Sequence, residues 1–175
     1  LAGYFIRGLP TMATATNGDG EIDTTASGAG RETFDLALVL SRDARDGAPA
    51  VLNLIDVVGE TAAVVSSIPL PGAARAHEVA ADVTTGLAYV TSVDEVYIVD
   101  ISQPQGRRGM ADEDGDGVDD RVLGRVAGLS GGGTIAVRPR EGEGATMVAG
   151  VAFVGSQKSD WELQTVELFN PATEQ

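Results

Sequence analysis

The residues whose types and spacing most clearly indicate chemistry lie in one acidic run, from Asp112 to Asp120. Its sequence, DEDGDGVDD, has aspartate at the first, third and fifth positions and glycine at the sixth. Carboxylates at alternate positions can surround one hard cation, and glycine at the sixth position permits the sharp turn that gathers them. The run therefore predicts a calcium loop, against the alternative of an acidic loop solvated by water alone.

The same spacing assigns the ligands. Three residues are predicted to bind through their carboxylates, one through its backbone carbonyl, and one directly or through water: in chain order, Asp112, Asp114, Asp116, Val118 and Asp120. At the twelfth position Leu123 stands where calcium loops place an acidic residue. Asp119 or a group outside the loop must then complete the coordination shell, so we expect weak affinity. The run resembles the calcium loops of thrombospondin type 3 and dockerin repeats, and this resemblance implies an extracellular protein.

A second acidic run, Asn17 to Asp23 (NGDGEID), has a similar alternation but lacks acidic residues at its outer positions. Ala15 stands at position one and Ala26 at position twelve. Two interpretations remain open for it, a second calcium site and a turn rich in Asx residues.

Short β-strands separated by tight turns must position these loops. The stretch from Ala76 to Pro104 contains three such runs, and the last, Val96 to Ile101, is almost wholly β-branched or aromatic. That composition predicts a strand buried on both faces. Similar pairs of runs recur around three serines, Ser41, Ser92 and Ser156. A period of roughly 40–50 residues with about four short strands per unit is typical of propeller blades.

The central repeat resembles a known family. Residues His77 to Asp100 resemble the YVTN and LVIVD classes of bacterial β-propeller repeat, which run roughly H-x-V-A-x-D-x-x-x-G-x-A-Y-V-T, then a turn, then V-x-I-V-D. With the two flanking repeats the resemblance extends from about Thr33 to the C-terminus. It implies a fold and not a reaction, because such repeats serve many functions.

The remaining segments fit that fold. Ala2 to Leu9 is expected to be a strand that closes a unit beginning earlier, and Thr61 to Leu70 to be an outer strand. Residues 105–120 are expected to be an insertion, after which Arg121 to Leu129 supplies the fourth strand of the central blade. The fold class is therefore all-β, with about three four-stranded blades in a single domain over residues 1–175.

Other candidate residues have structural explanations. His77, the single histidine, is assigned to the blade itself, hydrogen-bonded to a neighbouring loop, rather than to a general base or metal site. No G-x-S-x-G motif surrounds any serine, so no catalytic residue is assigned. Trp161 and Tyr97 are expected in the core or at its rim, with stacking on a sugar as the alternative.

Composition narrows the function. The net charge of −14 argues against partners with anionic surfaces, nucleic acid and membranes included. Cysteine is absent, which excludes disulfide and thiolate chemistry, and no apolar run approaches a membrane span. We therefore expect a non-catalytic, calcium-stabilised, secreted or cell-surface scaffold. Its partners would be proteins or further copies of itself, as a homo-oligomer or as part of a larger chain. The alternatives are a self-assembling subunit of an extracellular filament or layer, and a segment of a propeller enzyme.

Overall fold

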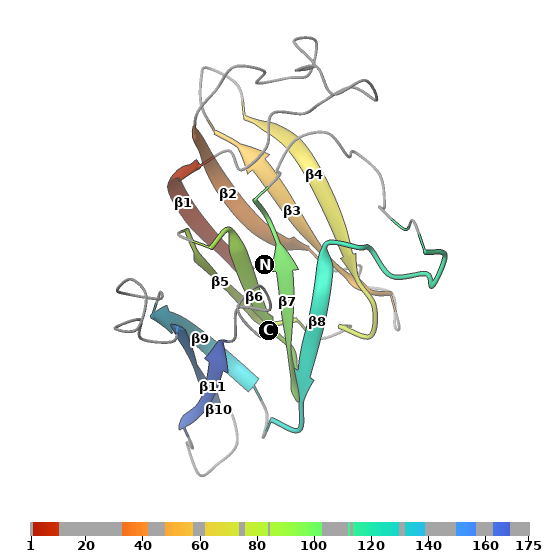
Figure 1. Cartoon of the computed structure of the whole chain (residues 1–175), viewed down its shortest axis with the longest axis vertical. Coiled ribbons are helices and arrows are strands. Elements are labelled where there is room, and N and C mark those ends of the chain that lie inside the picture. Colours follow the sequence, from red (N-terminus) through yellow and green to blue (C-terminus); the bar gives the residue numbers. More distant parts are fainter. Residues whose placement is uncertain are drawn as a thin grey trace, which may run out of the picture.

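The structure, a computed structural model, describes residues 2–10, 33–41, 48–57, 62–73, 76–83, 85–102, 112, 114–129, 132–138, 150–156 and 163–168. Within these ranges the chain forms eleven β-strands and no helix (Figure 1). The prediction of an all-β chain is thus confirmed for the described residues.

The strands form three antiparallel sheets, each following the order of the chain. The first sheet contains β1 (Ala2–Pro10), β2 (Thr33–Ser41), β3 (Ala50–Asp56) and β4 (Ala63–Leu70). The second contains β5 (Glu78–Asp82), β6 (Leu87–Thr91), β7 (Glu95–Asp100) and β8 (Val122–Ala127). The third contains β9 (Gly132–Arg138), β10 (Gly150–Ser156) and β11 (Leu163–Leu168).

Two predictions about strand membership have different outcomes. The fourth strand of the central unit does follow the acidic loop, because β8 pairs with β7. The expectation that the N-terminal strand closes an earlier unit is wrong, because β1 pairs with β2 and begins the first sheet. A strand's own residues specify that it is extended, but its partner depends on packing at long range.

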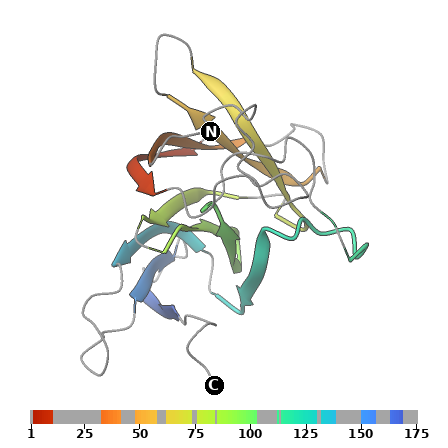
Figure 2. The same cartoon turned by 45° about the horizontal axis from the view of Figure 1, so that its top comes forward.

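The sheets are stacked in three layers, with the second in the middle (Figure 2). One hydrophobic cluster joins the first sheet to one face of the second, and another joins the opposite face of the second to the third. Along β7, Tyr97 and Val99 belong to the first cluster while Val96 belongs to the second. The prediction that this strand is buried on both faces is confirmed.

A buried hydroxyl also bridges each pair of neighbouring layers. Tyr97 Oη lies 2.8 Å from the carbonyl oxygen of Pro71, which follows the first sheet. On the other side, Thr91 Oγ1 donates to the carbonyl of Gly133 in the third sheet at 2.8 Å. These bonds satisfy polar atoms that would be costly to bury alone, and they fix the lateral position of the layers.

The three sheets share one register. Leu38 pairs with Leu54 in the first sheet, Tyr89 with Ile98 in the second, and Phe153 with Thr165 in the third. Leu38, Tyr89 and Phe153 each lie on the second strand of these three and pair on that strand's other side as well. Their partners there are Tyr4, Ala80 and Ala136, in that order. The recurring serines therefore mark equivalent strands, β2, β6 and β10, which end at or just before them.

The correspondence extends to an irregularity. The register between β3 and β4 shifts after the pair Leu54–Ser66, and that between β7 and β8 shifts after Ile98–Gly124. These pairs are equivalent in the shared register, so both four-stranded sheets carry a β-bulge at the same place. A bulge bends its strand locally, and its recurrence marks a repeated structural unit.

One turn depends on glycine. Gly86 joins β5 to β6 with φ of +69°, its N–H donates to Asp82, and its carbonyl accepts from Ile101. A Cβ at this position would lie 2.7 Å from Ser102 Cβ. The residue therefore permits both the left-handed turn and the close approach of the chain that leaves β7.

Replacing this glycine should destabilise the fold. We expect Gly86→Ala to lower the free energy of unfolding by about 1–3 kcal/mol, because it adds both backbone strain and a clash. The matched control is Gly124→Ala, whose added Cβ meets nothing within 4 Å. That control should change stability by less than about 0.5 kcal/mol. Urea denaturation of both variants measures the difference, and equal midpoints would contradict the packing argument.

Candidate metal centre

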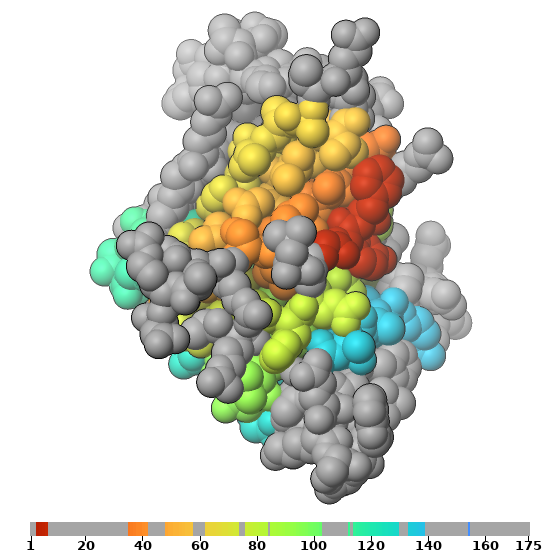
Figure 3. Space-filling view, turned by 180° about the vertical axis from the view of Figure 1, so that it is seen from behind, coloured from red at the N-terminus to blue at the C-terminus, as the bar shows by residue number. Residues whose placement is uncertain are grey.

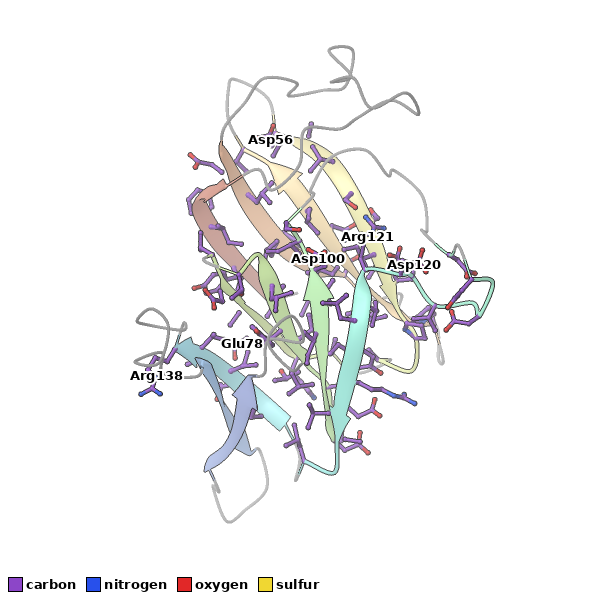
Figure 4. The ribbon with its side chains drawn as sticks, in the orientation of Figure 1. Asp56, Glu78, Asp100, Asp120, Arg121 and Arg138 are labelled. Carbon is purple, nitrogen blue, oxygen red and sulfur yellow. The ribbon has the colours of Figure 1, made fainter. Side chains whose placement is uncertain are left out.

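The acidic loop lies directly before β8, beside the edge formed by β4 (Figure 4). One carboxylate oxygen from each of Asp112, Asp114 and Asp116 lies within 4.8 Å of the others. Calcium binds oxygen at about 2.3–2.6 Å, so two oxygens on one ion lie at most about 5 Å apart. The three carboxylates that the sequence assigned as ligands are thus close enough to share one metal ion.

The backbone of the loop holds these carboxylates in place. Asp112 accepts hydrogen bonds from the amides of Gly115 at 2.7 Å and Gly117 at 3.2 Å. Asp114 Oδ1 accepts from the amide of Asp116 at 3.2 Å, and Asp116 Oδ1 from that of Val118 at 2.7 Å. Gly117, at the sixth position, has φ of +83°, as the sharp turn of a calcium loop requires.

The charges of the loop favour a cation. Two carboxylates about 4–5 Å apart repel each other by about 1 kcal/mol even in water. A divalent cation between them reverses the sign of this interaction. Asp114 and Asp116 are exposed, so an ion can reach them without crossing the core.

The two remaining predicted ligands lie at the end of the loop. Asp120 is exposed in the turn that leads into β8, and Val118, two residues earlier, is half-buried. Their participation in binding stays a prediction, because it depends on the path of the chain around an ion.

Asp119 has a different role from the one considered for it. Its side chain is buried, and it binds the Arg121 guanidinium at two points, Oδ1 to Nε at 2.7 Å and Oδ2 to Nη2 at 2.6 Å. Asp119 Oδ1 also accepts the backbone N–H of Arg121 at 3.1 Å. The alternative in which Asp119 completes the coordination shell is therefore wrong. A further ligand must come from a group outside the loop.

The same guanidinium reaches across to the first sheet. Arg121 donates through Nη1 to Ser66 Oγ and through Nη2 to the carbonyl of Ser67 at 3.3 Å, both on β4. Its carbonyl accepts from the amide of Asp100, at the end of β7. The Asp119–Arg121 pair thus connects the acidic loop, the second sheet and the first sheet. Figure 4 shows Arg121 at the start of β8.

Sequence reasoning assigned Arg121 only to the start of a strand. The sole local signal was a basic residue next to an otherwise acidic run. Its partner Ser66 is 55 residues away, and that proximity follows only from the stacking of the two sheets.

The two tyrosines of the second sheet, Tyr97 and Tyr89, lie in the core. Tyr97 is buried, its hydroxyl also lies 2.8 Å from Glu95 Oε2, and burial raises its pKa, so the core interpretation is confirmed. Burial, with a smaller contribution from Asp82, raises the pKa of Tyr89 to about 12.

His77 is half-buried, and its backbone N–H donates to the carbonyl of Thr91 at 2.8 Å. The run Asn17 to Asp23 and Trp161 lie outside the described residues.

Comparisons with protein-family models, curated proteins and solved structures find no match to this chain. In the part of the chain that the structure describes, no helix is long and apolar enough to cross a membrane.

Removing the guanidinium should uncouple the layers. We expect Arg121→Ala to lower the free energy of unfolding by about 2–4 kcal/mol, because Asp119 would stay buried without its compensating cation. Arg125→Ala is the matched control, since Arg125 is 59% exposed and lies 3.4 Å from Glu95. An ion pair whose cation is this exposed contributes less than about 1 kcal/mol. Chemical denaturation should separate the two variants, whereas similar losses would show that the buried pair has no special weight.

Proposed function

We propose that this chain is a non-catalytic, calcium-stabilised repeat domain of β-propeller type, which acts as a binding or structural scaffold outside the cell or at its surface. The observation that carries the proposal is the cluster of Asp112, Asp114 and Asp116 oxygens within 4.8 Å of one another. The loop's own amides orient these carboxylates, and the predicted spacing of a calcium loop is what brings them together.

The choice of calcium rests on the donors. The loop offers oxygen ligands only, which suit hard cations such as calcium and magnesium. Magnesium demands a tight octahedral shell and dehydrates reluctantly, whereas calcium accepts the irregular geometry of a flexible loop. With Leu123 exposed at position twelve, the affinity should be weak, roughly 10⁻⁴–10⁻³ M, in the range of extracellular modules. An affinity in that range would fit the proposed secreted or surface location.

The propeller interpretation is supported by repetition. Antiparallel sheets in chain order, a shared register and a recurrent bulge are what radially repeated blades require. In addition, β1 lies against β5 and β5 against β9, so the first strands of successive sheets are neighbours. Propeller blades are arranged in this way around an axis.

The scaffold role is supported by polar side chains that connect the layers of the fold. Arg121, Tyr97 and Thr91 form hydrogen bonds between layers, and Asp119 holds the Arg121 guanidinium. The net charge of −14 suits cations and basic protein partners and disfavours nucleic acid. A self-assembling subunit is the second candidate, favoured by the aromatic side chain of Phe5 on β1, which is 57% exposed.

Calcium should stabilise the folded chain. At about 10 mM calcium the gain should be about 1.4–2.7 kcal/mol, following RT ln(1 + [Ca]/Kd) with the affinity above. For a domain of this size that corresponds to a rise in Tm of roughly 3–10 °C. Thermal unfolding followed by circular dichroism, in calcium and then in chelator, measures this shift. Magnesium at the same concentration should give a much smaller one.

The matched variants are Asp116→Ala, which removes a predicted ligand, and Asp94→Ala, which removes one exposed carboxylate from a turn elsewhere. Asp116→Ala should lose most of the calcium-dependent shift, while Asp94→Ala should keep it. If chelator leaves the Tm of the unmodified chain unchanged, the loop is only a solvated acidic turn.

A further inference from the structure

Two peptide bonds of the acidic loop join an aspartate to a glycine, Asp114–Gly115 and Asp116–Gly117. When the amide nitrogen of the next residue attacks the Cγ of an aspartate, the side chain loses water and closes into a succinimide ring. A side chain on that next residue obstructs the attack, whereas glycine has no Cβ. A Cβ built on Gly115 or Gly117 would meet nothing within 4 Å, so no neighbouring group crowds either bond.

Solvent reaches both of these bonds. The acidic loop protrudes from one side of the molecule, at the left edge of the space-filling view (Figure 3). Asp114, Asp116 and the two glycines that follow them are all exposed. Because water must leave when the ring closes and must attack when it opens, this exposure permits both halves of the reaction.

Each of the two aspartate side chains is folded back over its own following peptide bond. Asp114 Oδ1 accepts from the amide of Asp116 at 3.2 Å, and Asp116 Oδ1 accepts from the amide of Val118 at 2.7 Å. A carboxyl group that bonds to the backbone two residues further on forms an Asx turn, which closes around the peptide nitrogen in between. That nitrogen belongs to the glycine. The attacking nitrogen and the Cγ are therefore neighbours in the folded loop.

A third carboxylate faces both glycine amides. The N–H of Gly115 donates to Asp112 Oδ1 at 2.7 Å, and the N–H of Gly117 donates to Asp112 Oδ2 at 3.2 Å. An amide nitrogen attacks through the face of its peptide plane and must give up the proton that lies in that plane. A carboxylate at hydrogen-bond distance from that proton can accept it. Asp112 thus offers one oxygen to each of the two reacting bonds.

We propose that Asp114 and Asp116 isomerise to isoaspartate through a succinimide, with Asp112 as the proton acceptor. The glycine nitrogen bonds to the Cγ of the carboxylic acid form, and the bond from Cγ to the hydroxyl breaks. The N–H proton passes through Asp112 to the departing hydroxyl, which leaves as water. Water then opens the ring. Opening at Cγ restores aspartate, and opening at the main-chain carbonyl gives isoaspartate. The reaction consumes no oxidant, reductant or co-reactant other than water.

The isomerisation does not depend on calcium, but its regulation by calcium rests on the proposed function. Isoaspartate adds one carbon to the backbone and attaches its carboxylate directly to Cα, so the alternate spacing of the ligands is lost. A metal ion binds the deprotonated carboxylate, and a carboxylate held by an ion has no hydroxyl to lose. Calcium should therefore protect the loop, and a loop left without calcium should lose its metal site with age.

Incubation in water enriched in the heavy oxygen isotope, with chelator and at neutral pH, tests the reaction without calcium. Each cycle of ring closure and opening inserts one labelled oxygen, and peptide mass spectrometry locates it. We expect label and isoaspartate at Asp114 and Asp116 to appear at least tenfold faster than at Asp94 and Asp100, because the residues that follow these two carry side chains. Labelling of Asp114 and Asp116 that is no faster than at these reference sites would overturn the proposal.

Two matched variants test the proton acceptor. Asp112→Asn keeps the shape of the side chain and one acceptor oxygen but removes the base, so it should slow both sites at least fivefold. Asp94→Asn removes the same charge from an exposed turn elsewhere and should leave both rates unchanged. Circular dichroism spectra should be the same for both variants. If Asp112→Asn reacts as fast as the unmodified chain, the proposal is wrong.

Addition of calcium separates this inference from the metal site. At about 10 mM calcium, with the affinity proposed above, labelling should slow about 10–100-fold, because only the calcium-free loop reacts. Labelling that proceeds in chelator and is not slowed by calcium would leave the isomerisation standing and remove the proposed metal site. A Tm that rises with calcium, without labelling in chelator, would keep the metal site and refute the isomerisation.

Discussion

Both faces of the middle sheet are buried along β5, β6 and β7, and the other two sheets are held in place by that burial. A strand in such a sheet must be apolar at nearly every position, which explains the almost continuous runs around Tyr89 and Val99. Apolar packing alone is not directional. The hydroxyls of Tyr97 and Thr91 add direction, because each reaches a single carbonyl in a neighbouring layer. The middle sheet thus determines both the stability and the alignment of the stack.

The acidic loop is connected to this stack at one point. Asp119 is the penultimate residue of the acidic run, and its buried pair with Arg121 connects the loop to β4 in the first sheet. Order in the loop and contact between the two sheets therefore share the same residues. A cation that fixes Asp112 to Asp116 restricts the chain that leads into this pair. Calcium would then stabilise the contact between layers as well as the loop itself, which suits a scaffold.

The sequence was informative where structure depends on neighbours along the chain. Alternation and β-branched runs predicted the strands of the middle sheet, and the spacing of Asp112, Asp114 and Asp116 predicted their convergence. The sequence did not predict contacts between residues that are far apart along the chain. Nothing local to Ala2–Pro10 shows that it pairs with β2, and nothing local to Arg121 shows that Ser66 lies beside it. The shared register became visible only once strands could be paired residue by residue.

The central claim is that calcium binding by the acidic loop is coupled to the contact between the first two sheets. Backbone amide NMR spectra recorded during a calcium titration test it most directly, at constant ionic strength. We predict saturable shifts of one common affinity for Gly115, Gly117 and Val118, and the same curve for Arg121 and for Ser67 across the interface. If calcium and an equivalent amount of sodium give the same small, non-saturating shifts in the loop, the claim is contradicted. Saturable shifts confined to the loop would leave the site but remove its coupling to the fold.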